Sequence, residues 1–314
     1  MESEVSVIPF SLGPLAAFAA SFTWVWGSST YVQLSKTNHF LTINLTRSLV
    51  STLLGLLVWL TAQILGFGDL FAISQEQWVA SLPWLAAGVL MSVVLGDALF
   101  FLAGTRIGIT NTQAVAATYP LWASLVGIWL LGDTIGGLKW IGIILSVICI
   151  SMLILGSLKK NPLMEKASSQ SIVAGFFLAF GTSLFWAGNS LFSSKGASTI
   201  PVLVANTTRM ASCAMICAVG VYLFRKRNSE TIPFILSWSD FKLVKWPLVM
   251  ESFAGSFLFV YGISRSSFTL GVILTSMAPI ISLVFLAMQG KESITLTKVI
   301  YLILLCTGVA LVGF

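Results

Sequence analysis

The chain has 314 residues, of which 57% are hydrophobic and 9% are charged, and its mean hydropathy is +0.95. About a quarter of the residues of a soluble domain are charged, so 17 basic and 11 acidic side chains are too few to cover a water-soluble globule of this size. This composition excludes a soluble protein and makes the lipid bilayer the solvent for most of the chain. The net charge of +6 sits mainly in short connectors, and no basic arm indicates nucleic-acid binding.

Ten apolar stretches follow one another along the chain, and each is close to the roughly 20 residues that a helix needs to cross a bilayer. The runs are continuous and lack the period of two that β-barrel strands show. We therefore expect an all-α integral membrane protein with ten transmembrane helices. The predicted helices cover residues 11–33, 39–65, 81–103, 109–131, 138–157, 171–194, 199–224, 244–264, 269–290 and 294–314.

The connector at residues 158–170 divides the chain nearly in half. We expect a first five-helix repeat at 1–157, a linker at 158–170 and a second five-helix repeat at 171–314. Pro120 and Pro279 lie inside predicted helices, where each should kink the helix and free a backbone carbonyl.

An internal repeat supports this division. A shift of 162 residues superposes identical residues of the two halves, and among them are Trp24 on Trp186, Asn44 on Asn206, Thr46 on Thr208 and Arg47 on Arg209. A shift of 159 residues does the same for later residues, including Gly96 on Gly255, Arg106 on Arg265 and Pro120 on Pro279. Five helices per copy is an odd number, so the second copy should be inverted in the membrane. Inverted repeats are typical of secondary transporters, whose substrate site lies near the midplane.

The aligned halves resemble the EamA-type members of the drug/metabolite transporter superfamily. The resemblance rests on the aromatic-rich first helix of each half (22–27 and 185–189) and on an arginine in the second, Arg47 or Arg209. The fourth helix of each half carries Tyr119-Pro120 or Ala278-Pro279 and ends near an acid, Asp133 or Glu292. The resemblance implies export or exchange of small metabolites, and it leaves the substrate open.

Four charged residues fall inside predicted helices and more than five residues from their ends: Arg47, Asp97, Arg209 and Glu251. Charged groups in lipid are costly, so all four should face protein or a wet cavity. Arg47, Asp97 and Glu251 are expected about 10 Å from the same membrane face and are therefore able to meet. One hypothesis is that Asp97 and Glu251 line the pathway, where one of them binds a proton or a cationic group. The alternative is a structural ion pair, with the arginines as packing anchors.

Polar and aromatic residues near the middle of the helices are candidates for the substrate pathway. Trp24 and Trp186 lie away from the interfaces where tryptophan is enriched, so each needs a partner for its N–H or a ligand to stack on. Asn189, Gln113 and Tyr119 are further candidates, and for all five residues ordinary packing remains the alternative. His39, the single histidine, is expected in a turn.

Two arguments disagree about which side of the membrane the termini lie on. Twelve Lys and Arg residues fall in the odd-numbered connectors and three in the even-numbered connectors and termini, which places both termini outside the cytoplasm by the positive-inside rule. The family resemblance implies the opposite.

The leading prediction is a secondary transporter in the cell (inner) membrane. A proton-coupled exporter is one form that this transporter could take. A non-transporting membrane scaffold or sensor is the alternative. An enzyme is not expected, because no nucleophile motif or acidic cluster occurs. We expect no cofactor and no metal, and the four cysteines lie in apolar stretches as small hydrophobes. The expected partners are a small molecule, the bilayer and, for a coupled transporter, protons, with the chain as a monomer or a homodimer.

Overall fold

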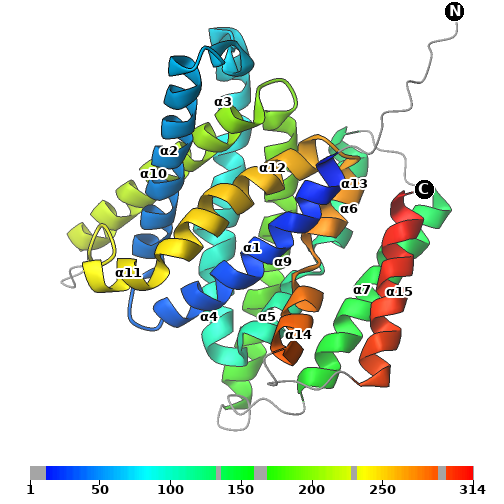
Figure 1. Cartoon of the computed structure of the whole chain (residues 1–314). Helices are drawn as coiled ribbons and strands as arrows, with labels where there is room; N and C mark the ends of the chain where they lie inside the picture. The colour runs from blue at the N-terminus through cyan, green and yellow to red at the C-terminus, as the bar shows by residue number, and fades with distance from the viewer. Residues whose placement is uncertain (1–11, 132–135, 159–167, 228–231, 289–294, 314) are drawn as a thin grey trace, which may run out of the picture.

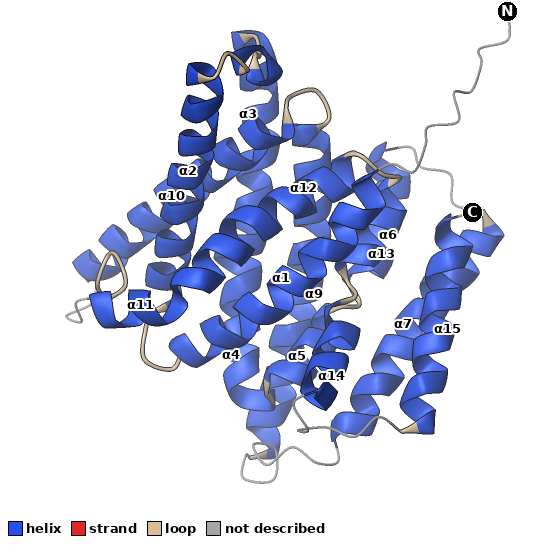
Figure 2. Ribbon diagram, in the orientation of Figure 1, coloured by secondary structure: helices blue, strands red, loops and turns tan. Residues whose placement is uncertain are grey.

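The computed structural model describes residues 12–131, 136–158, 168–227, 232–288 and 295–313, and within these ranges every regular element is a helix (Figure 2). The first half contains α1 (Leu12–Leu34), α2 (Phe40–Ile64), η1 (Gly68–Phe71), α3 (Gln75–Val89), η2 (Leu90–Gly96), α4 (Asp97–Ile107), α5 (Ile109–Ala116), α6 (Tyr119–Leu131) and α7 (Gly137–Leu158). The second contains α9 (Ser169–Ala197), α10 (Val202–Arg227), α11 (Trp238–Pro247), η3 (Leu248–Gly255), α12 (Ser256–Ser264), α13 (Phe268–Thr275), α14 (Ala278–Met288) and α15 (Leu296–Gly313).

Helices occupy described residues in each of the ten predicted stretches, two of which contain two short helices each. That all ten stretches cross the bilayer stays a prediction. Five helical runs are long and apolar enough to cross a bilayer, namely 40–64, 75–107, 169–197, 202–227 and 238–264. Two of them begin six residues before their predicted starts at 81 and 244, because serine caps start new helices there. Ser74 accepts a hydrogen bond from the Gln77 N–H in a capping box, and Ser237 accepts one from the Asp240 N–H.

The two prolines break their helices rather than kink them. The α5 helix ends at Ala116 and α6 begins at Tyr119, one residue before Pro120. The second half repeats this break between α13 and α14, before Pro279. Neighbouring helices satisfy carbonyls at the second break: the Tyr119 hydroxyl donates to the Val272 carbonyl at 3.0 Å, and the Ser21 hydroxyl donates to the Leu274 carbonyl at 2.8 Å. Side chains of other helices thus bind carbonyls near this break, and a partner for the carbonyl that each proline itself frees stays a prediction.

Equivalent helices of the two halves pair with each other. The α2 helix packs against α10 and α7 packs against α15; in Figure 1 α7 and α15 run side by side, whereas α10 crosses α2 at an angle. The first helix of each half packs mainly on the other half, because α1 contacts η3, α12 and α13, while α9 contacts α3, η2, α4 and α6. This exchange brings residues of both halves to one central region.

Many polar side chains are buried inside the molecule, while many large apolar side chains are exposed on its outside, as a bilayer solvent allows. On α2, Thr42, Asn44 and Ser48 are fully buried, whereas Leu53 and Leu57 are 65% and 58% exposed. Together with its long apolar helices, this distribution marks the chain as a multi-pass integral membrane protein.

Each half contains one π-helical segment at an equivalent position, η2 before Asp97 and η3 before Ser256. A π turn shifts the backbone hydrogen-bond register and offers carbonyls to other partners. In η2, Asn44 donates its side-chain amide to the Val93 carbonyl, and the Thr182 hydroxyl donates to the Gly96 carbonyl at 3.2 Å. Polar side chains from α2 and α9 thus meet the carbonyls of η2.

Candidate functional site

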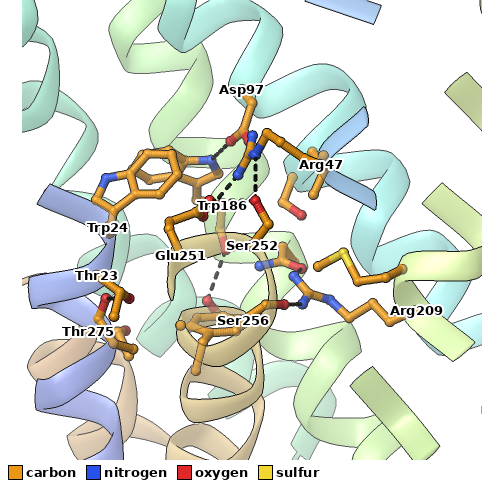
Figure 3. Close-up of a pocket in the computed structure, with 18 of the residues that line it drawn as sticks. Thr23, Trp24, Arg47, Asp97, Trp186, Arg209, Glu251, Ser252, Ser256 and Thr275 are labelled. Carbon is orange, nitrogen blue, oxygen red and sulfur yellow. Dashed lines mark hydrogen bonds and ion pairs between the residues drawn. The ribbon is translucent and has the colours of Figure 1, made fainter. Parts of the chain in front are cut away.

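A central cavity lies between the halves and is lined by both of them (Figure 3). The space open to the centres of water-sized molecules is about 130 Å³, far above the roughly 10–15 Å³ that one water needs. The lining residues come from α1, α2, η2, α4 and α6 of the first half and from α9, α10, η3, α12 and α13 of the second. Such a cavity is large enough for several waters or for a small organic molecule.

Arg47 is the centre of a buried ion triad at one side of this cavity. Its Nη1 lies 2.7 Å from Asp97 Oδ2, and its Nη2 lies 2.9 Å from Glu251 Oε1. The three side chains are at most 9% exposed, and Figure 3 shows both carboxylates directed at the guanidinium. The predicted meeting of these three residues is confirmed. One cation between two carboxylates leaves the triad with a formal charge of −1.

Neutral donors and aromatic rings complete the surroundings of the triad. The Ser252 hydroxyl donates to Glu251 Oε2 at 3.0 Å, and the Tyr31 hydroxyl lies 3.0 Å from that of Ser252. The Trp186 indole N–H donates to Asp97 Oδ1 at 3.2 Å, which supplies the partner that a tryptophan in mid-helix requires. Each carboxylate therefore has a hydrogen bond besides its ion pair, as buried charges need.

Arg209 reaches the cavity from α10 and has a different environment. Its Nη1 donates to the Ser256 hydroxyl at 2.8 Å and its Nη2 to Asn189 Oδ1 at 3.2 Å, so both of these partners are neutral. Among the described residues, no carboxylate lies within 4.0 Å of its guanidinium nitrogens. Its Nε and the side-chain nitrogen of Asn206 are buried with no hydrogen-bond partner in the described part of the chain. Arg209 is nevertheless only 4% exposed.

The repeat explains why the two arginines differ. The 159-residue shift that superposes the later helices places Ser256 on Asp97 and Ser92 on Glu251. The Arg209 site therefore has serine at both positions where the Arg47 site has an acid, Ser256 from the second half and Ser92 from the first, and both serines line the cavity. Asn206 and Arg209 repeat Asn44 and Arg47, but the acids that neutralise Arg47 have no equivalent.

Four of the five pathway candidates line the cavity: Trp24, Tyr119, Trp186 and Asn189. The Trp24 and Trp186 rings meet edge to face with centroids 5.2 Å apart. The fifth candidate, Gln113, does not line it. Gln113 is buried in a hydrogen-bonded bridge, where it donates to Ser28 at 2.9 Å and accepts from Ser282 at 2.8 Å. Its geometry is that of a packing residue joining the two halves.

Sequence reasoning missed several lining residues, above all Ser256, Ser252, Phe259 and Thr275. Serine and threonine in an apolar helix carry little signal alone, because they satisfy themselves on their own backbone. For Ser256 a signal did exist, since the repeat aligns it with Asp97.

The remaining predicted positions add no second site. His39 lies in the turn before α2 and caps that helix by accepting the Leu41 N–H. Cys149, Cys213 and Cys217 are buried free thiols, and no group of three or more metal-binding side chains occurs among the described residues. Asp133 and Glu292 lie outside the described residues.

Comparison with known proteins identifies the class. The model of the EamA-like transporter family matches residues 11–155 and again residues 173–314. The chain therefore belongs to the EamA-like transporter family, and the resemblance noted from its motifs is confirmed. A solved structure described only as "Crystal structure of protein" has a TM-score of 0.68 and 18% identity, over 96% of each chain. At that identity the likeness extends to the fold alone. No curated protein matches the chain.

Proposed function

We propose that this protein is a secondary transporter that moves a small organic metabolite across the cell (inner) membrane. In this proposal the repeats, residues 1–157 and 171–314 joined by the linker 158–170, each form five transmembrane helices and are inverted relative to each other. Substrate binds in the central cavity and reaches each side in turn as one repeat rocks against the other. Family membership supports transport as such, while the substrate and the cycle are our inference.

The observation that carries the proposal is a cavity between the halves that contains four buried ionisable side chains. Arg47, Asp97, Arg209 and Glu251 all line it. Charges at such depth are expensive, and a scaffold or sensor needs no polar interior. A transporter does need one, because a polar solute must exchange its water for protein groups along the pathway.

The ion triad supplies a plausible means of proton coupling. The Arg47–Glu251 pair joins the two halves, whereas the Arg47–Asp97 pair lies within the first half. A proton on Glu251 would convert the triad from a charge of −1 to zero and would weaken the pair that holds the halves together. Asp97 would keep Arg47 neutralised meanwhile. Loading and release of one proton would in this way be linked to the movement of one half against the other.

The chain reconstituted in proteoliposomes provides the test. A panel of amino acids, organic acids, amines and nucleosides is loaded, and flux is followed with and without an imposed pH gradient. We expect flux of at least one solute class above protein-free liposomes, accelerated by the gradient. Flux of no solute under any gradient would contradict transport and would favour the scaffold.

A further inference from the structure

Arg209 is a buried cation whose described partners are all neutral, in a cavity where the equivalent arginine has two acids. Burial of a charge is costly unless an opposite charge compensates it. Asp97 and Glu251 compensate Arg47, to which both are directly paired. Arg209 has Ser256 and Asn189 instead, and its Nε has no partner among the described residues.

From this asymmetry we infer that Arg209 is the binding site for an acidic group of the substrate. The inference rests on the proposed function and specifies its substrate class, a small organic monoanion. The acidic group, a carboxylate or a phosphate ester, would take the place that Asp97 has beside Arg47. A guanidinium is suited to this role because its planar donors match such groups two at a time.

The rest of the cavity indicates what the anion carries. Trp24, Trp186 and Phe259 line it together with Met210. The Phe259 ring centroid lies 5.4 Å from the Arg209 guanidinium carbon. An apolar or aromatic body bound against these rings would place its acidic group at Arg209. In Figure 3 Arg209 and Ser256 lie together, apart from Asp97 at the other end of the labelled cluster.

The charges that line the cavity also limit how many acidic groups the substrate can carry. The triad of Arg47, Asp97 and Glu251 has a formal charge of −1, so a second anionic group on the substrate would meet repulsion at that end of the cavity. We expect one acidic group at the Arg209 end and a neutral remainder.

Ligand-induced thermal stabilisation of the full-length protein in detergent tests the inference, since it requires no transport. The probes are matched pairs: benzoate with benzamide, phenylacetate with phenylacetamide, and phenyl phosphate with phenol. We expect at least one acid to bind about tenfold or more tightly than its neutral match, as one charge-assisted pair would give. The carboxylate and phosphate arms distinguish the two acidic groups. Equal binding within every pair would overturn the inference.

Two variants at one position make the test specific. Ser256→Asp would supply Arg209 with the acid that Asp97 supplies to Arg47, and the helix tolerates aspartate at that equivalent position. We expect S256D to raise the melting temperature without ligand and to abolish the preference for acids. Ser256→Asn, which adds similar bulk without charge, should weaken binding of an acid and of its neutral match by a similar factor, whereas Arg106→Gln, outside the cavity, should leave the preference for acids unchanged. An unchanged preference in S256D and in Arg209→Gln would contradict the assignment.

The binding test and the flux screen fail independently. A preference for acids that depends on Arg209, in a protein that moves no solute, would contradict transport but not the anion site. Solute flux with no such preference would contradict the anion site and leave transport standing.

Discussion

Arg47 and Arg209 occupy equivalent positions in the two halves and have opposite electrostatic environments. Arg47 has two carboxylate partners, within 2.9 Å, and Arg209 has hydrogen bonds to serine and asparagine. Both side chains are about 95% buried, so burial alone does not separate them. Both copies of the repeat therefore have the arginine, whereas the positions of Asp97 and Glu251 are serines around Arg209. Within the described residues the protein neutralises Arg47 itself, and in our proposal an acidic ligand neutralises Arg209.

The largest expected effect comes from removing the neutralised cation. Arg47→Gln leaves Asp97 and Glu251 buried side by side with no cation, which should cost about 3–5 kcal/mol of stability. Thermal unfolding in detergent measures this loss. Arg209→Gln is the matched control: it removes a cation that has no carboxylate partner, so its melting temperature should stay near that of the wild type. Equal losses in both variants would remove the distinction between the two arginines.

Removing one acid should have a smaller effect. Asp97→Ser gives the first half the residue that the second half has at Ser256, while Glu251 still neutralises Arg47. The loss of one charge-assisted hydrogen bond predicts a cost of roughly 1.5–3 kcal/mol. The same unfolding assay should place D97S between the wild type and R47Q. A cost as large as that of R47Q would indicate that Glu251 alone cannot hold Arg47.

A glycine permits the close approach of Glu251 to α1. A Cβ on Gly27 would lie 2.6 Å from Glu251 Cγ and 2.7 Å from its Cβ, and the equivalent position in the second half is Asn189. Gly27→Ala should therefore displace Glu251 and cost roughly 1–3 kcal/mol through overpacking. Gly137→Ala is the control, because nothing lies within 4 Å of a Cβ there. Wild-type stability in G27A would show that Glu251 moves freely.

The smallest expected effect is the pH dependence of stability that His39 causes in the turn before α2, outside the triad. Burial lowers the pKa of His39 below its ordinary value of 6.5, and its neutral Nδ1 caps α2. Because the unfolded chain takes up a proton more readily, stability should fall as the pH drops below about 6.5. The loss should stay below about 1 kcal/mol. His39→Asn keeps a capping oxygen without titrating and should flatten this dependence in pH-resolved unfolding. A wild-type slope in H39N would assign the dependence to other groups.

The sequence predicted where the helices lie because long apolar runs are separated by polar connectors, and five of the helical runs are long and apolar enough to cross a bilayer. It also predicted the Arg47 triad, since buried charges at similar depth in an apolar chain have few partners besides one another. It left Gln113 open between the pathway and packing, and the structure places this residue in a hydrogen-bonded bridge rather than in the cavity lining. It missed the early starts of α3 and α11, which depend on serine caps. Depth could not predict that Arg209 has no carboxylate partner among the described residues, because that depends on which helix faces it. The alignment of Asp97 with Ser256 did contain this information.

We propose that the protein moves a solute through its central cavity and that the triad of Arg47, Asp97 and Glu251 couples this transport to protons. The most direct measurement is solute flux in proteoliposomes, with and without a pH gradient, for the wild type, Asp97→Asn and Glu251→Gln. We predict that E251Q loses gradient-driven accumulation and retains exchange of solute between the two sides, because the pair joining the halves no longer responds to a proton. Gradient-driven transport that stays unchanged in both variants would contradict the claim.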